Sequence, residues 1–157
     1  MACELFTREF SKKGGETILV TTRQLSASKA LELHVDLIGT LGNAVFPFID
    51  NKYNFSDVIN IMRGNDGATV MKLIKECISH VNIDGKEIRP ALFDIHFDGE
   101  LMLVMQLFGF VLEANFLDFF KQGLEINERR RLEAEEASKL AAQKLKAEQT
   151  SQSNSQK

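Results

Sequence analysis

The feature that most constrains the fold is a twelve-residue apolar run, Leu101–Leu112, in which Gln106 is the only clearly polar residue. A helix with this composition is apolar on almost every side, so other elements or lipid must cover it. A membrane span needs about 20 such residues, and charged side chains follow Leu112 too soon for that. We therefore expect a central core helix from about Asp98, a suitable cap, to about Gly123.

The composition changes abruptly after this helix. Residues 125–148 hold six acidic and six basic residues and few large apolar side chains. Pairs such as Glu125 with Arg129 stand four residues apart in the favourable order, which supports a marginal, solvated helix. The last residues, TSQSNSQK, have no apolar content and are expected to be disordered. We therefore divide the chain into a helical domain, 1–124, and a charged helical extension with a disordered tail, 125–157.

The first part of the chain predicts a short β-hairpin. Leu5–Phe10 and the β-branched run Thr17–Thr22 flank the turn SKKGGE, in which glycine can take a positive φ. A lone hairpin is only marginally stable, so it must lie against the helices or pair with a further strand of this chain or of another copy. Ile83–Ile88, with Asp84-Gly85 as its turn, is the candidate strand.

Three further helices are expected between the hairpin and the apolar run. Ser26 is placed to cap the first, which Pro47 ends. Asn54 or Ser56 is placed to cap the second, which the cluster Gly64–Gly67 terminates. The apolar positions on their faces are Leu31, Val35 and Ile38 beside Leu37, Leu41 and Ala44 in the first, Val58, Ile59 and Met62 in the second, and Val70, Leu73, Ile74, Cys77, Ile78 and Val81 in the third. The fold class is therefore mainly α: a small helical domain with a short N-terminal β-hairpin, a long central apolar helix and a charged C-terminal helix and tail.

Charge and cysteine content narrow the function classes. A formal net charge of -3 provides no basic field that would draw the chain to nucleic acid or to an anionic membrane. Acidic residues flank the run Arg129–Arg131, and no aromatic is interleaved with it, so we interpret it as a solvated helix face. There is no glycine-rich phosphate loop, and Cys3 and Cys77 lack a partnered spacing. The first 20 residues do not match a secretory signal, so we expect a cytoplasmic protein. From the charge and the missing motifs, we expect no cofactor and no nucleic-acid or membrane partner.

The histidines offer the one catalytic alternative. Asp94 and His96 alternate with apolar residues and could share one face of an extended segment, with His34 or His80 as a third ligand. Such a set would suit a metal-assisted hydrolase. The sequence shows no close ligand spacing and no placed nucleophile, so we expect neither catalytic nor metal-binding residues, and we interpret Asp94 or Asp98 as a cap.

Phenylalanine is unusually frequent for a chain of this size. The sequence has 12 phenylalanines and no tryptophan, and five of the phenylalanines fall within residues 108–120. These rings point to several sides of one helix. Either all of them are buried in the core, or some are exposed and form an apolar patch. Such a patch would mark a binding or self-association surface. Both interpretations stay open. The candidate partner-binding residues are Phe110, Leu112, Asn115, Phe116, Phe119 and Phe120.

Three segments carry a family resemblance. They are Thr21-Thr22-Arg23-Gln24-Leu25, the stretch FDIHFDGEL that starts at Phe93, and the stretch FVLEANFLDFF that starts at Phe110. Together, over residues 17–120, they resemble the tail assembly chaperones of long-tailed bacteriophages, in which an FDxHFxG segment precedes a long apolar helix ending in LExNFxDFF. Ala114 stands where that pattern has a larger residue, and the charged extension has no counterpart in it.

The resemblance implies a non-catalytic protein that binds the long helical tape measure protein, keeps it soluble and promotes polymerisation of the tail tube (major tail) protein around it. It implies action in the cytoplasm of the bacterial host and absence from the mature virion. A tape measure exposes apolar helical stripes that aggregate unless an apolar surface covers them, and a phenylalanine-rich helix suits that task. The alternative is a minor structural tail component, such as a completion or connector protein, that self-assembles and stays in the virion.

Overall fold

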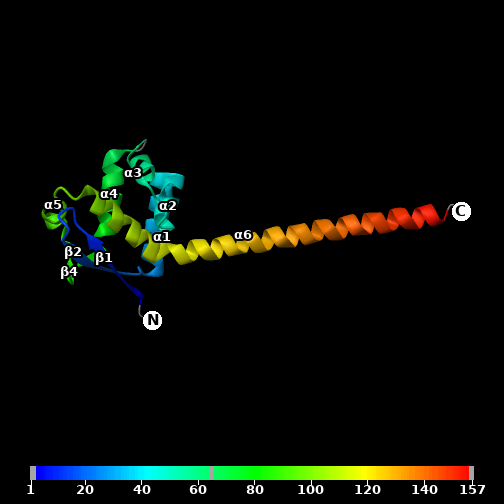
Figure 1. Ribbon diagram of the computed structural model, residues 1–157, viewed down its shortest axis with the longest axis horizontal. Coiled ribbons are helices and arrows are strands. Elements are labelled where there is room, and N and C mark those ends of the chain that lie inside the picture. Colours follow the sequence, from blue (N-terminus) through cyan, green and yellow to red (C-terminus); the bar gives the residue numbers. More distant parts are fainter. Residues whose placement is uncertain (1–2, 64–65, 156–157) are drawn as a thin grey trace. The chain divides into compact units, whose positions relative to one another are not determined.

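The fold is mainly α, as the sequence predicts. The computed structural model describes residues 3–63 and 66–155 (Figure 1). These form two compact units, Met1–Leu117 and Asp118–Lys157. The boundary that composition places after residue 124 lies within the second unit and stays a prediction.

One antiparallel sheet runs along the first unit, in the strand order β1-β2-β3-β4. Its strands are β1 (Leu5–Ser11), β2 (Thr17–Arg23), β3 (Val81–Ile83) and β4 (Lys86–Glu87). The predicted hairpin is β1 with β2, and the predicted additional strand pairs with β2 as β3. Asp84 and Gly85 take φ values of 48° and 79°, which suit a tight two-residue turn between β3 and β4.

The helices follow the expected order, with two short 3-10 turns and two short helices between the longer ones. Their bounds are α1 (Ala27–Leu41), η1 (Gly42–Val45), α2 (Phe46–Ile49), α3 (Phe55–Met62), α4 (Gly67–Ile78), η2 (Pro90–Leu92), α5 (Phe93–Phe97) and α6 (Leu101–Asn154).

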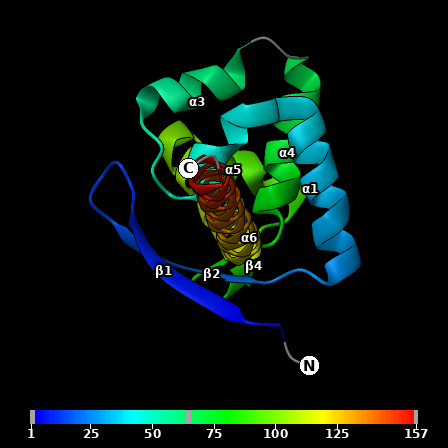
Figure 2. The same ribbon diagram turned by 90° about the vertical axis from the view of Figure 1, so that its right-hand side faces the viewer.

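The apolar first part of α6 is the core of the first unit, as predicted, and it lies between the sheet and the other helices (Figure 2). On the sheet side, the ring of Phe110 meets Phe10 edge to face, with centroids 5.6 Å apart. On the helix side, Phe108 packs on Phe48 at 5.7 Å. Among the described residues, α6 is the one helix long and apolar enough to cross a membrane, yet most of its apolar window is buried inside the protein.

The predicted cap of the second helix is confirmed. The Asn54 side chain accepts a hydrogen bond from the Asp57 N–H, and the Asp57 carboxylate accepts one from the Asn54 N–H, which together form a capping box for α3. α3 buries Val58 and Ile61, and it ends at Met62. In the cluster predicted to terminate it, Gly64 and Asn65 lie outside the described residues.

The apolar face predicted for the third helix is also confirmed. α4 buries Val70, Leu73, Ile74, Cys77 and Ile78, and Val81 is buried in the strand that follows. Asp66 caps this helix by accepting a hydrogen bond from the Ala68 N–H at 3.3 Å.

The predictions for the first helix are partly wrong. Its buried stripe is Leu33, Leu37 and Leu41, whereas Leu31 and Val35 are exposed. Several overlapping stripes of α1 are apolar, and the position of the neighbouring helices rather than periodicity decides which one is buried.

The ends of α1 also differ from the prediction. Ser26 occupies the N-cap position, but its side chain makes no capping hydrogen bond. Pro47 does not end α1, because the helix stops at Leu41 where Gly42 takes a φ of 56°. Pro47 lies instead in the first turn of α2, where its missing N–H costs nothing.

The start of the central helix lies three residues after the predicted cap. Asp98 follows the last residue of α5, and Gly99 has a φ of 73°, which turns the chain before α6 begins at Leu101. The expected end at Gly123 is wrong, because helix α6 continues to Asn154. A glycine costs a helix about 1 kcal/mol but does not stop it when no proline or turn follows.

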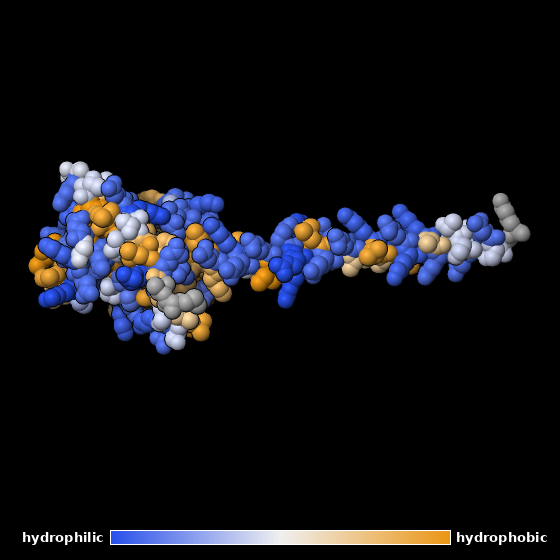
Figure 3. Space-filling view, turned by 90° about the horizontal axis from the view of Figure 1, so that it is seen from below, coloured by the Kyte–Doolittle hydropathy of each residue, from blue (hydrophilic) through white to orange (hydrophobic). Residues whose placement is uncertain are grey.

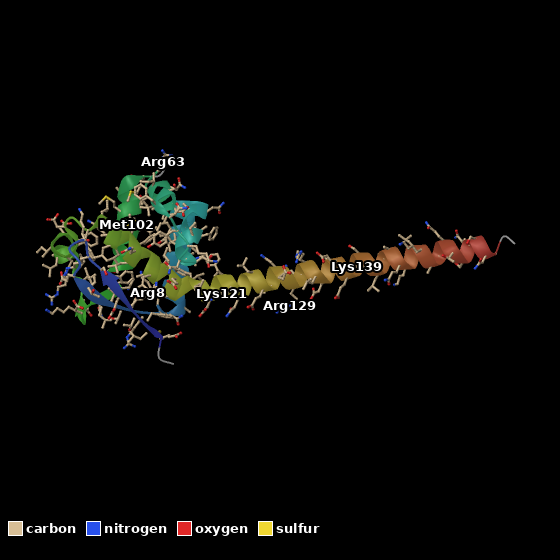
Figure 4. The ribbon with its side chains drawn as sticks, in the orientation of Figure 1. Arg8, Arg63, Met102, Lys121, Arg129 and Lys139 are labelled. Atoms are coloured by element: carbon tan, nitrogen blue, oxygen red, sulfur yellow. The ribbon has the colours of Figure 1, made fainter. Side chains whose placement is uncertain are left out.

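The second unit contains the remainder of α6 as a solvated helix. Leu132, Leu140 and Leu145 are exposed. Figure 3 shows small hydrophobic spots among mostly hydrophilic residues along this helix. Charged side chains such as Arg129 and Lys139 point into solvent (Figure 4). Among the described residues of this unit, the ion pairs are those of Arg131, with Glu128 at 2.6 Å and Glu135 at 3.3 Å, rather than Glu125 with Arg129.

The predicted disorder at the chain end differs from the structure, which continues the helix through Asn154. Hydroxyl groups there bond back to carbonyls one turn earlier, as Thr150 Oγ1 does to the Lys146 carbonyl at 2.8 Å.

Candidate functional site

Three of the six candidate partner-binding residues belong to the core. Phe110, Leu112 and Phe116 are buried in the first unit, and Phe116 packs on the His34 ring with centroids 5.3 Å apart. These residues therefore do not form the exposed surface that the sequence analysis proposed. In this structure, all three side chains are part of the core.

Asn115 has a structural role just beyond the end of strand β2. Its Oδ1 accepts a hydrogen bond from the Leu25 N–H at 2.8 Å, and its Nδ2 donates to the Val111 carbonyl at 2.9 Å. Since β2 ends at Arg23, this side chain fixes the path of the chain between the sheet and α1.

The remaining two candidates lie in the second unit. Phe119 is 61% exposed and Phe120 is half-buried, and their rings meet edge to face at 5.6 Å. Of the six predicted residues, Phe119 is therefore the one that presents most of its ring at the surface.

An apolar groove of about 650 Å³ lies between α3, α4, α5 and the start of α6 in the first unit. Its size falls in the range of ligand sites in proteins. Hydrophobic residues gather in patches on the surface of this unit in Figure 3. The groove is lined by Met62, Gly67, Val70, Met71, Ile74, Lys75, Phe93, Asp94, Phe97, Asp98, Gly99, Leu101, Val104 and Met105.

The sequence builds this groove from two helices that present exposed apolar residues beside their buried faces. On α4, Met71 is 57% exposed next to buried Val70 and Ile74. On α6, Leu101 is 65% exposed, while Met105 is buried and forms part of the floor.

A tight turn brings the remaining wall into place. The positive φ of Gly99 turns the chain between α5 and α6, so that Phe97 and Leu101 line the same hollow. Phe93 and Phe97 pack on each other within α5, with ring centroids 4.9 Å apart.

The chemistry of the lining favours an apolar guest. Met62, Met71 and Met105 contribute flexible, polarisable thioethers, which adapt to guests of different shape. The lining has three charged residues among those described: Lys75, whose Nζ lies 5.1 Å from the centre of the Phe93 ring, and the exposed Asp94 and Asp98. Such a surface suits the apolar face of an amphipathic helix.

Sequence reasoning missed this groove, although a signal for it was present. The chain has five methionines, and Met62, Met71 and Met105 line the groove. A fourth, Met102, is exposed near the start of α6 (Figure 4). Methionines at exposed helix positions are a sign of an adaptable binding surface, but the cluster of phenylalanines is the more conspicuous feature of the sequence.

The catalytic alternative loses its geometric basis. Asp94 and His96 lie on helix α5 rather than on an extended strand, so they do not share one face as the alternation suggested. Within residues 3–63 and 66–155, no three histidine, cysteine or acidic side chains come together in a group that could hold a metal ion.

Comparison with known proteins identifies the family. A family model described as phage tail assembly chaperone protein, TAC, matches residues 15–127, which include the hairpin strand β2, all the helices of the groove and the apolar part of α6. No curated protein and no solved structure matches the chain. The match covers well over half of the sequence, and the chain therefore belongs to the family of phage tail assembly chaperone proteins.

Proposed function

We propose that this chain binds the tape measure protein of the phage tail, keeps it soluble and promotes polymerisation of the tail tube protein around it. The apolar groove between α3, α4, α5 and α6 is the observation that carries the proposal. A tape measure protein is a long helical chain, and a groove lined by methionine and phenylalanine covers one apolar stripe of such a helix.

The composition of the groove suits a partner that must later be released. Its lining offers many modest apolar contacts, and its charged members among the described residues are Lys75, Asp94 and Asp98. A buried ion pair with the partner would be costly to break, whereas apolar contacts at an open groove allow fast dissociation. The tube protein can then replace the chaperone along the tape measure.

The protein acts in this proposal as a binding module without catalysis, in the cytoplasm of the bacterial host, and it leaves before the virion is complete. Mass spectrometry of purified virions tests the last point. Absence of the chain supports the chaperone, whereas its presence in stoichiometric amounts supports a structural tail component.

Co-expression tests the proposal itself. The tagged chain is produced together with the tape measure protein, and the soluble tape measure protein that co-purifies is measured. The parent chain should yield a soluble complex, and a double variant in the groove, Met71→Glu with Leu101→Glu, should reduce its recovery at least tenfold. Both side chains are more than half exposed, so their replacement should leave the fold intact.

The chain offers a matched control for this experiment. Leu31 and Val35 on α1 are 65% and 61% exposed and lie outside the groove. Leu31→Glu with Val35→Glu should therefore recover as much tape measure protein as the parent. If the groove variant recovers as much tape measure protein as the parent, the assignment of the groove is wrong. If both double variants lose recovery, the added negative charge is responsible rather than its position in the groove.

A third variant separates the groove from the surface that the sequence predicts. Phe119→Asp changes the exposed ring of the second unit and leaves the groove unchanged. Recovery at the level of the parent would assign binding to the groove alone. Loss of recovery would instead place a contact at Phe119.

A further inference from the structure

Strand β1 forms an outer edge of the sheet. It pairs with β2 alone among the described elements, since the strand order is β1-β2-β3-β4 (Figure 2). The pairing with β2 is continuous over seven residue pairs, from Leu5 with Arg23 to Ser11 with Thr17, and no bulge interrupts it. An edge this long exposes a row of backbone donors and acceptors that can accept another strand.

The register shows which backbone groups lie on the free side. The Gln24 N–H donates to the Glu4 carbonyl, and the Lys12 N–H donates to the Glu16 carbonyl, so even-numbered residues of this strand bond to β2. In an antiparallel ladder, alternate residues point their N–H and C=O to opposite sides. The free groups are therefore those of Leu5, Thr7, Glu9 and Ser11.

The usual protections of an edge strand are weak here. β1 contains no proline and no lysine. Its one inward-pointing charge is Arg8, which is neutralised by the Glu113 carboxylate at 2.9 Å and lies over the Phe110 ring at 4.9 Å. The outer side of the strand is thus available for pairing.

The free edge is also complementary to itself. Two β1 strands can pair antiparallel about a two-fold axis that passes through Arg8. Leu5 then stands opposite Ser11 of the second copy, and Thr7 stands opposite Glu9. All four residues carry backbone N–H and C=O groups on the free side of the strand. In this register, odd-numbered residues face odd-numbered residues and even-numbered residues face even-numbered ones. The side chains that point to the core therefore lie on the same face of the joined sheet in both copies, and the helices of both copies cover that face.

Side chains support the same register. Phe6 stands opposite Phe10 of the second copy, which forms an aromatic pair at each end of the joined strands. Glu4 stands opposite Lys12, so opposite charges meet there, and Lys12 also pairs with Glu16 of its own copy at 3.4 Å. The two Arg8 side chains meet at the axis, and each has its own Glu113 as counter-charge.

We infer that two copies of this chain associate through β1, which pairs with the same strand of the second copy to make one continuous sheet. The strand edge lies outside the groove, so this association does not depend on the binding of a tape measure protein.

A proline at the free edge tests the inference. Thr7→Pro removes an N–H that faces the second copy and leaves the bonds of β1 to β2 intact, and proline is tolerated at such positions. Thr7→Val keeps this N–H and the β-branched shape, so it is the matched control. Light scattering over a range of concentrations should give twice the chain mass of 17.7 kDa for the parent and for Thr7→Val, and 17.7 kDa for Thr7→Pro. A parent chain that stays monomeric, or a folded Thr7→Pro variant that still dimerises, would overturn the inference.

Disulfide trapping tests the register even if the proline variant fails to fold. In a Cys3→Ser background, which removes the exposed native thiol, one tagged chain carries Thr7→Cys and an untagged chain carries Glu9→Cys. The proposed register brings these thiols to adjacent positions on paired strands, within the range that a disulfide spans. Mixing the two should give a cross-linked pair in high yield, and Thr7→Cys alone should give little. Equal cross-linking of Thr7→Cys alone, or none in the mixture, would contradict the proposed pairing.

Discussion

The guanidinium of Arg8 and the carboxylate of Glu113, which stand 105 residues apart in the sequence, form a two-bond ion pair with distances of 2.9 and 3.1 Å. It joins the edge strand β1 to the central helix α6, and the same guanidinium covers the face of the Phe110 ring. Both side chains are partly screened from water, so this pair is stronger than a surface pair.

We expect Arg8→Ala to lower the free energy of unfolding by about 1 to 2 kcal/mol, because it removes both hydrogen bonds and a cation–π contact. Chemical denaturation followed by the fluorescence of Tyr53, the single tyrosine of the chain, measures this directly. Lys52→Ala is the control, since its pair with Asp50 is well exposed and should contribute little. An equal loss in both variants would contradict the special role of the Arg8 pair.

The two N-cap residues that the sequence analysis named should differ in their effect on stability. Asn54→Ala removes the capping box of α3 and should cost about 1 kcal/mol. Ser26→Ala should cost much less, because the Ser26 side chain makes no capping bond. The same denaturation assay compares them, and a larger loss for Ser26→Ala would show that the assignment of the caps is wrong.

These caps illustrate how much of the fold the sequence predicts. The hairpin, the turn at Asp84-Gly85, the cap at Asn54 and the buried face of α4 all follow from local rules, because turn residues and a clear helical period act within a few residues. The helical segments after residue 26 and the central position of the apolar part of α6 follow from composition in the same way.

Other features depend on distant contacts, and the sequence does not predict them. Leu31 and Leu33 are equally apolar, and the packing of α1 decides that Leu33 is buried. The same limit applies to the site: the rings of Phe110 and Phe116 are buried by β1 and α1, whereas Met71 and Leu101, unremarkable in the sequence, come together at the groove.

The glycine in the buried first part of α6, Gly109, is required by packing rather than by backbone conformation. A Cβ atom at Gly109 would lie 3.2 Å from Cε1 of Tyr53, whose ring stacks flat on Phe48 with centroids 4.4 Å apart. We expect Gly109→Ala to lower stability by up to about 1 kcal/mol, because crowding of the ring outweighs the gain in helix propensity.

Gly39 on α1 is the matched comparison. No atom lies within 4 Å of the position that its Cβ would take, so Gly39→Ala should raise stability by about 0.5 to 1 kcal/mol. If both substitutions stabilise the chain to the same extent, as thermal denaturation would show, the close packing of Gly109 on Tyr53 is not significant.

His80 should make the stability of the first unit depend on pH. Burial and then the nearby charge of Lys29 lower the pKa of His80 below its ordinary value of 6.5. The unfolded chain therefore binds a proton more readily than the folded chain, so the contribution of His80 is fully present above pH 6.5 and is lost as the pH falls through this value and below.

His80→Gln should reduce this dependence. Urea denaturation between pH 7.5 and pH 5.5 should show a decrease in unfolding free energy for the parent chain and a smaller decrease for the variant. The same slope for both proteins would mean that the environment of His80 does not favour its neutral form.

The central claim is that the groove takes an apolar helix of the tape measure protein, and methionine methyl NMR tests it most directly. The chain is labelled at its methionine methyl groups and titrated with a peptide that spans an amphipathic helix of the tape measure protein. The account predicts saturable shifts, at one peptide per chain, of the methyl signals of Met62, Met71 and Met105, which line the groove, with smaller changes at Met102 outside it. Saturable binding that leaves the three groove signals unchanged would contradict the claim.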